Sequence, residues 1–121
     1  MDISLLTQSD TADCVIVDPA TGEKTDIVIT VYGQDSAEYR TALVEAARKA
    51  AKSDDEQGEQ RAFEFLAKLT KSWSGVEQGS KKLSCNMKNA ILVYSTCGTI
   101  KKQVDRFIAD SKNFMPPRLT A

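Results

Sequence analysis

Few residues of this 121-residue chain could carry out chemistry. The sequence contains no histidine, the side chain that most often serves as a general base near neutral pH. It also lacks the serine motif that positions a nucleophile and the glycine-rich motifs that cradle phosphates. Gly75 and Gly79 do not form a glycine-rich motif, because they have neither the right spacing nor a preceding predicted strand. We therefore predict that the protein is not an enzyme and uses no cofactor.

Two groups of side chains could be considered for metal binding. Cys14, Cys85 and Cys97 show no CxxC spacing, and a zinc site would need four ligands from cysteine and histidine, so we predict free, buried thiols. The acidic residues 54–56 could hold a divalent cation weakly, but they lack the alternating ligands and the turn glycine of a calcium loop. We expect a solvated acidic loop there and no metal site.

Residues 86–112 read as two helices joined by a glycine, an arrangement typical of a helix-turn-helix. The outer face of the second helix is predicted to offer Lys101, Lys102, Gln103 and Arg106, and its three basic residues could contact a partner. Tyr94, however, lies where a tight helix crossing needs a small residue, and the pI of about 5.5 is low for a DNA-binding domain. We favour a packed pair of helices, so nucleic acid is not the expected partner.

Trp73 is the only tryptophan, and it lies in a stretch, residues 63–114, that also holds all four phenylalanines. Aromatic side chains remove the most apolar surface from water, so most of the core is predicted to come from this stretch. Trp73 itself could be an exposed anchor for a partner, but large aromatic residues are usually buried. A position in the core or in a lid is favoured, and partner contact is kept as the alternative.

Two short runs rich in β-branched residues, 13–18 and 26–32, flank a turn at residues 19–24 that contains proline and glycine. This pattern predicts a β-hairpin. In its second strand one face is formed by Ile27, Ile29 and Val31, and the other face is also largely apolar. Because a lone hairpin is marginally stable and has open edges, extra strands, a helix or another subunit must cover it. We predict that these three residues contact a partner or a second copy.

Helical spacing of apolar residues predicts the rest of the fold. A helix capped by Asp35 or Ser36 is expected to run to Lys52, with its apolar stripe at Tyr39, Leu43, Ala46, Ala47 and Ala50. A second helix is expected over residues 59–72, followed by a break at residues 73–77 and an exposed loop at 78–84.

Two more helices are predicted near the C-terminus. The first is capped by Asn86 or Ser84 and stopped by Gly98, and the second starts at Thr99. Ile100, Val104, Phe107 and Ile108 are expected on the inner face of this last helix, and Phe114 and the prolines after it should end the ordered structure.

The expected fold is therefore α+β: an N-terminal β-hairpin or small antiparallel sheet followed by three to four helices. We predict a single domain over residues 1–121, with flexible ends at 1–12 and 115–121. No apolar run approaches the roughly 20 residues of a membrane span, and the first residues do not have the pattern of a signal peptide, so a cytoplasmic protein is expected.

Charge is distributed unevenly along the sequence. Residues 1–35 carry seven acids and one base, a charge of −6, whereas residues 61–121 carry eleven bases and four acids, a charge of +7. Such asymmetry favours head-to-tail self-association or an acidic partner, although a solvated basic face without any partner would look the same in sequence.

In three places the chain resembles the tail assembly chaperones of lambda-like, long-tailed bacteriophages and prophages. The first is the DPATGE turn at 18–23 with residues 29–36 (ITVYGQDS) and Tyr39-Arg40 after it; the second is WSGV at 73–76. The third is NAIL at 89–92, followed by the Ile100, Gln103-Val104 and Ile108 pattern that closes on Asn113-Phe114. Together they span residues 13–115, with a departure at 83–87, where the family often has a Pro-Phe-Ser-like helix entry.

The resemblance implies a non-enzymatic role in the host cytoplasm. Such chaperones bind the long, largely helical tape measure protein and keep it soluble. They also help to recruit the major tail protein as the tail tube forms, and some assemble into rings or spirals. Two other functions are kept as alternatives: a structural tail or head–tail component that stays in the virion, and a small helix-turn-helix DNA-binding regulator.

Overall fold

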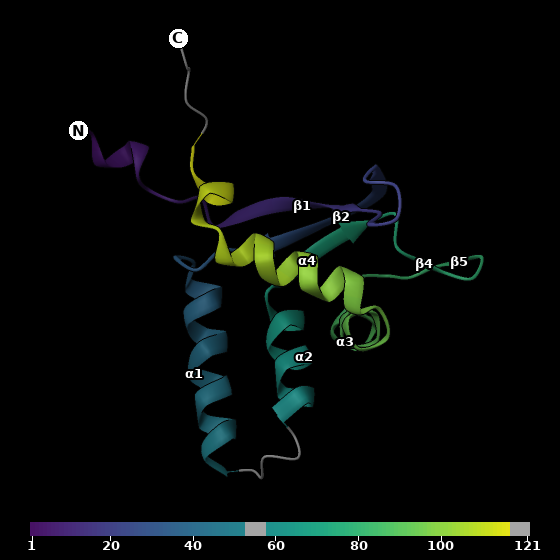
Figure 1. The fold of residues 1–121 in the computed structure, drawn as a ribbon. Coiled ribbons are helices and arrows are strands. Elements are labelled where there is room, and N and C mark those ends of the chain that lie inside the picture. The colour runs from purple at the N-terminus through teal and green to yellow at the C-terminus, as the bar shows by residue number, and fades with distance from the viewer. Residues whose placement is uncertain (53–57, 117–121) are drawn as a thin grey trace.

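The computed structural model describes residues 1–52 and 58–116. Its centre is a three-stranded antiparallel sheet in the order β1-β2-β3, built from β1 (Thr11–Val17), β2 (Lys24–Tyr32) and β3 (Thr70–Ser74). Four α-helices accompany the sheet in the described part of the chain (Figure 1). The predicted α+β class, with a small antiparallel sheet at the N-terminus, is confirmed.

The predicted hairpin forms from β1 and β2. In its turn the Asp18 amide donates to the Glu23 carbonyl at 2.9 Å, and Gly22 adopts a φ of 76°, which costs little without a side chain. The strand begins at Thr11, so the last two residues of the predicted flexible end, 11–12, belong to the sheet. Before it, a short 3-10 helix, η1 (Ile3–Leu5), forms part of that end.

The third strand is the main departure from the predicted fold. A helix was expected to continue to residue 72, but α2 (Gly58–Lys68) ends earlier and β3 pairs with β2, placing Trp73 opposite Ile29. Thr70 turns its hydroxyl back to the Leu66 carbonyl at 3.0 Å, and the Tyr32 amide donates to the Leu69 carbonyl at 2.8 Å. Pairing with an open sheet edge outweighs helix propensity here. A strand therefore does precede Gly75, against the prediction.

One face of the sheet is buried and the other faces outward. The buried face carries Cys14, Ile16, Ile29 and Val31. On the outward face the exposed Asp13 and Val15 of β1 lie beside half-buried Val28 and Thr30 of β2 and exposed serines of β3, and Thr30 donates to Asp13 at 2.7 Å. The predicted surplus of apolar strand surface is therefore smaller than expected, because β3 covers one edge and brings polar residues to this face.

Helices α1 (Ala37–Lys52) and α2 form an antiparallel pair that projects away from the sheet (Figure 1). The predicted cap at Ser36 is present, since its hydroxyl accepts from the Tyr39 amide at 3.1 Å. Tyr39 packs edge-on against Phe65 of α2, with ring centroids 5.6 Å apart, and joins the two helices. The acidic residues 54–56 between them, proposed as a weak cation site, lie outside the described residues.

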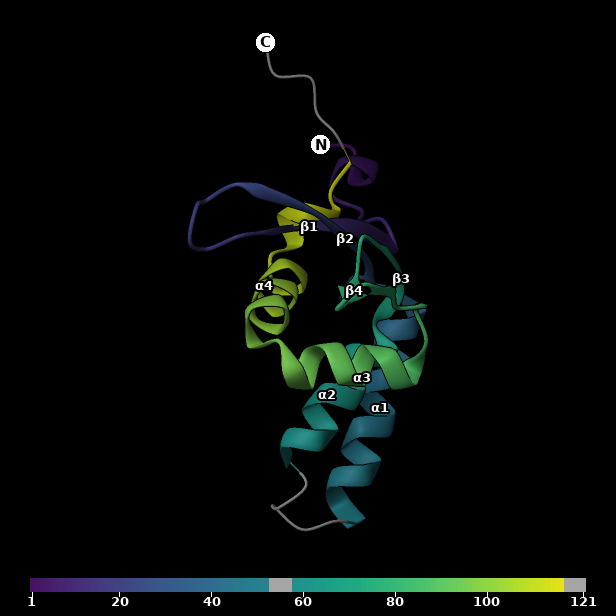
Figure 2. The same ribbon diagram turned by 90° about the vertical axis from the view of Figure 1, so that its right-hand side faces the viewer.

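Helix α3 (Met87–Thr96) packs across α2, and α4 (Gly98–Ala109) lies along the sheet (Figure 2). The predicted cap of α3 is confirmed, because the Asn86 side chain accepts from the Asn89 amide at 2.8 Å. The start of α4 differs from the prediction: Cys97 alone separates the helices, and Gly98 is the first residue of α4 rather than a stop.

A buried hydrogen bond joins α3 to the sheet. Tyr94 is almost completely buried, and its hydroxyl lies 2.5 Å from that of Thr70 at the start of β3. Burial raises the pKa of Tyr94 above its ordinary value, so the phenol remains protonated and the bond persists at neutral pH. The tyrosine that argued against a helix-turn-helix is a core residue.

After α4 the C-terminal segment of the described chain lies beside the residues that precede β1. Residues Ser111–Phe114 form a short 3-10 helix, η3, and the Ser9 amide and hydroxyl both donate to the Phe114 carbonyl, at 2.7 and 3.1 Å. The Phe114 ring is buried against Phe107 with centroids 5.6 Å apart. Phe114 is thus part of the core, as expected for the aromatic residues of 63–114, and the last helical element ends at this residue.

Candidate functional site

Residues Ile27, Ile29 and Val31 were predicted to contact a partner. The structure places all three on the inner face of the sheet, where Ile29 and Val31 are 0% exposed. The side chains of Ile29 and Val31 are buried in the core of the same chain, so these two residues cannot form an accessible surface in this fold. Ile27, also in β2, is partly exposed. We therefore remove Ile29 and Val31 from the candidate contact residues.

Trp73 is half-buried on the same inner face. Its indole Nε1 donates to the Leu83 carbonyl at 2.8 Å, which fixes the segment that leads into α3 against the sheet. The favoured interpretation of Trp73 as a core or lid residue agrees with this position. A partner would have to break the indole hydrogen bond to use the ring as an anchor.

The predicted basic face of α4 is present, with one change. Lys102 and Arg106 are exposed, and Lys101 forms an ion pair with Asp105 at 2.8 Å along the helix. Gln103, which was grouped with them, instead faces the sheet. Its side-chain amide donates to the Val17 carbonyl at 2.7 Å and accepts from the Val17 amide at 2.8 Å.

The helix-turn-helix geometry is also different from the expectation. The two helices are separated by a single residue, Cys97, whereas that motif uses a turn of three to four residues. The second helix packs along β1 through Gln103, and its Lys102 and Arg106 are exposed. The arrangement is that of a packed helix pair, the interpretation favoured from the sequence.

An exposed apolar area lies on α1. Leu43 is 51% exposed and Val44 is 57% exposed, and Ala47, Ala50 and Ala51 are exposed on the adjoining turns. We call these five residues the α1 face. The contact with α2 is made by Tyr39, Ala42 and Ala46. The predicted stripe therefore combined two sides of the helix: some of its residues face α2, and others, such as Leu43, are exposed.

A second apolar feature is a groove of about 280 Å³ between the β4–β5 hairpin and helices α3 and α4. The hairpin consists of β4 (Glu77–Gln78) and β5 (Lys81–Lys82), in a segment predicted as an exposed loop. Six apolar residues line the groove: Ile27, Val76, Leu83, Leu92, Val93 and Ile100. We call it the hairpin groove. Sequence periodicity missed it because its walls come from four separate elements.

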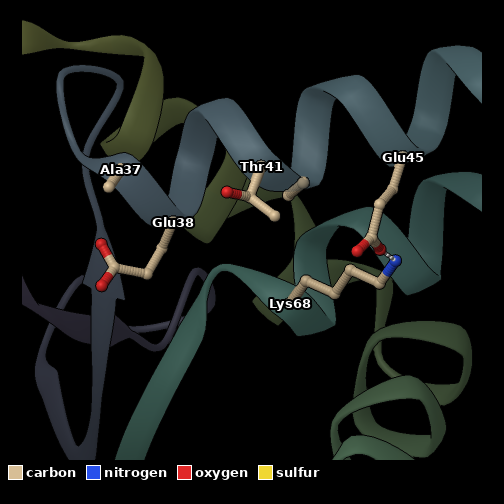
Figure 3. A pocket seen from close by; sticks show the side chains of 6 residues that line it. Ala37, Glu38, Thr41, Glu45 and Lys68 are labelled. Atoms are coloured by element: carbon tan, nitrogen blue, oxygen red, sulfur yellow. Dashed lines mark hydrogen bonds and ion pairs between the residues drawn. The ribbon is translucent and has the colours of Figure 1, made fainter.

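Another hollow, with a volume of about 410 Å³, lies between α1 and the end of α2 (Figure 3). Glu45 and Lys68 face each other across it as an ion pair, and Glu38 and Thr41 lie further along α1. The Lys68 hydrogen bond lowers the pKa of Glu45, which therefore stays ionised at neutral pH. An ionised carboxylate already paired with a lysine is suited to holding two helices together rather than to proton transfer.

No protein-family model, curated protein or solved structure matches this chain.

The described residues contain no group of three or more acidic or cysteine side chains that could hold a metal ion. All three cysteines are free; Cys14 is buried, and Cys85 and Cys97 are partly exposed. Within the same ranges, 1–52 and 58–116, every helix is too short or too polar to cross a membrane.

Because Cys14 is buried, we predict that the folded protein loses stability at alkaline pH. Burial raises the pKa of its thiol from 9.0 to about 11, so the folded protein keeps the proton that the unfolded chain releases. The contribution of the protonated Cys14 thiol to the free energy of unfolding is complete below about pH 9 and is lost as the pH rises towards 11. Between about pH 8 and 10.5 we expect urea titrations to show about 2 kcal/mol more loss of unfolding free energy in the wild type than in Cys14→Ala. Equal losses would contradict this prediction.

Proposed function

We propose that this protein is a tail assembly chaperone of a lambda-like long-tailed bacteriophage or prophage. In this role it binds the tape measure protein in the host cytoplasm, keeps it soluble and helps to recruit the major tail protein, without catalysing a reaction. Two lines of argument support the proposal. One is the resemblance of residues 13–115 to this family, and the other is the α1 face, the single structural observation on which the proposal depends.

The α1 face has the properties of a docking surface for a helix. Ala47, Ala50 and Ala51, which lie within about one turn of each other, leave room for close approach of another helix, and Leu43 and Val44 supply protruding apolar side chains. The helix pair projects from the sheet, so a long helix could lie along α1 without meeting the body of the protein (Figure 1). A largely helical tape measure protein offers many such segments.

Charge narrows the kind of helix that fits. Helix α1 carries four bases and two acids, and one of those acids, Glu45, is already paired with Lys68. Arg40 and Arg48 lie beside the apolar residues on the exposed side of the helix. The preferred segment is therefore an amphipathic helix with acidic residues beside its apolar stripe.

The test is co-expression of the full chain with the tape measure protein encoded by the same phage genome. The wild type should keep the tape measure protein in the soluble fraction and copurify with it. The double substitution Leu43→Glu and Val44→Glu should weaken this binding at least tenfold, because both charges would be buried without partners. Val15→Glu is the control for an added acidic residue elsewhere, since Val15 is an exposed apolar residue on the outer side of the sheet.

The proposal is wrong if the tape measure protein stays insoluble with the wild type. If it copurifies equally with both variants, the α1 face is not the binding surface. Two measurements separate the alternatives. A structural tail component would be found by mass spectrometry in purified virions, whereas a chaperone would be absent from them. A DNA-binding regulator would shift duplex DNA in a gel with a strong dependence on salt.

A further inference from the structure

Strand β3 forms one edge of the three-stranded sheet, and no other strand of the described chain pairs with its outer side. The elements that pack most closely against it are β2 and α2. The opposite edge is different, because α4 lies along β1 and its Gln103 bonds to the backbone of Val17. Figure 2 shows α4 on one side of the molecule and β3 on the other. The β3 edge is therefore the edge at which another strand could be added.

The hydrogen bonds of β2 alternate between its two neighbours, as in any central strand of an antiparallel sheet. The Gly33 amide, directly after β2, donates to the Asp10 carbonyl on the β1 side at 2.8 Å. The Tyr32 amide donates to the Leu69 carbonyl on the β3 side, also at 2.8 Å. Even-numbered residues of β2 therefore bond towards β3, and odd-numbered residues bond towards β1.

This alternation identifies the backbone groups of β3 that face the open edge. Ser72 lies opposite Thr30, and Ser74 lies opposite Val28, so both serines bond to even-numbered residues of β2. The amide and carbonyl of Trp73, between the two serines, consequently point away from β2. In the described part of the chain no hydrogen bond reaches either group, and only the indole of Trp73 bonds outside the sheet. The edge thus presents one donor and one acceptor side by side.

The charge at this edge indicates which kind of strand fits. Lys71 is exposed, and among the described residues no acid forms an ion pair with it. It has no partner residue on β2, because the pairing shifts by one between Thr30 and Val31, and β3 contains no acidic residue. A lysine at a bulge discourages indiscriminate pairing. Two copies of β3 edge to edge would bring their lysines together, whereas a strand with acidic side chains would neutralise Lys71.

We propose that the β3 edge binds an extended, acidic segment of another protein, which adds antiparallel to β3 as a further strand. The Trp73 amide and carbonyl bond to the backbone of this segment. One of its acidic side chains lies beside Lys71, and an apolar side chain lies on the same face as the half-buried indole. These residues are not those of the α1 face, so the inference concerns a second surface and does not depend on the proposed binding of the tape measure protein.

A short synthetic peptide in which valine and aspartate alternate is the probe. Trp73 is a built-in reporter, because it is the only tryptophan of the chain. Titration of the full chain with this peptide should change the tryptophan fluorescence in a saturable way. Amide hydrogen exchange measured by NMR should become slower at Trp73 and change little at Ser72 and Ser74, whose amides already bond to β2.

Backbone methylation of the peptide separates strand addition from a purely side-chain contact. N-methylation of the valine amides removes the donors that face Trp73 and should abolish binding. N-methylation of the aspartate amides is the matched control, since these amides point away from β3 and most of the binding should remain.

Lys71→Glu tests the contribution of charge. It should weaken binding of the valine–aspartate peptide at least tenfold in low salt and should strengthen binding of a valine–lysine peptide. Lys102→Glu is the matched control, because Lys102 is an exposed lysine on α4, and this variant should bind like the wild type. Circular dichroism verifies that each variant is folded.

Three results would each overturn the inference: a wild type that does not bind the valine–aspartate peptide, binding that survives N-methylation of the valines, and equal effects of Lys71→Glu and Lys102→Glu. A fourth would assign the edge to a second copy of the chain instead. In that case the Trp73 amide would become protected as the protein concentration rises, without any peptide.

Discussion

Replacing Phe114 by alanine is expected to lower the free energy of unfolding by about 3–5 kcal/mol. Phe114 is 1% exposed, and its ring fills the space beside Gly33, where a Cβ atom would lie only 2.7 Å from the ring. The ring also packs edge-on against Phe107. Loss of the ring would leave a cavity between the sheet and the end of α4, and urea denaturation followed by circular dichroism measures the cost.

Met115→Ala is the matched control for this substitution. Met115 is the next residue and is only half-buried, so its truncation should cost about 1 kcal/mol or less. If Phe114→Ala costs no more than Met115→Ala, the end of the described chain is not part of the core. Residues 1–8 provide a second readout. Because Ser9 is held by the Phe114 carbonyl, these residues should become more accessible to proteases when the position of Phe114 is disturbed.

Gly75→Ala is expected to be the second most damaging substitution, at about 3 kcal/mol. Gly75 has a φ of 76°, and an added Cβ would lie 2.2 Å from the backbone carbonyl oxygen of Asp26. The Asp26 carbonyl belongs to the backbone and the Cβ atom is bonded directly to the backbone, so neither can rotate away from the other. The neighbouring β3 would have to move from β2, which would also displace Trp73 and weaken its hydrogen bond to Leu83. Thermal unfolding should show the loss.

Gly79→Ala separates the effect of the clash from that of the backbone conformation. Gly79 has a similar φ of 65°, but no atom lies within 4 Å of the position of its Cβ. Its substitution should cost only about 1 kcal/mol, from the positive φ alone. Equal effects at the two positions would show that the approach of Gly75 to Asp26 has no energetic importance.

Much of the fold could be predicted because local signals agree with it. The turn and the helix caps are determined by residues close in sequence. The turn predicted at 19–24 forms at 18–23, and the caps at Ser36 and Asn86 were each one of the two residues expected. The strand β3 could not be predicted in this way. Residues 70–74 have no strong strand pattern of their own, and they become a strand because β2 presents an open edge to them.

The candidate contact surfaces were harder to predict, for a related reason. Ile29 and Val31 were correctly expected in a strand, but their burial depends on helices that follow them much later in the sequence. On α1 the predicted stripe contained both Leu43 and Ala46, which face different ways, because periodicity alone does not show which side of a helix is covered. The hairpin groove is lined by residues of β2, β4, α3 and α4, which are far apart in the sequence, so no sequence pattern predicts it.

The side chain of Gln103 has a consequence for how copies of this chain can join. Its amide offers one donor and one acceptor in the same arrangement as a peptide group, so for Val17 it imitates the neighbouring strand that β1 lacks. A foreign strand therefore cannot extend the ladder there without first expelling a native side chain. Growth of the sheet by continuous backbone pairing, the route to irreversible fibrils, is therefore blocked at this position of the β1 edge.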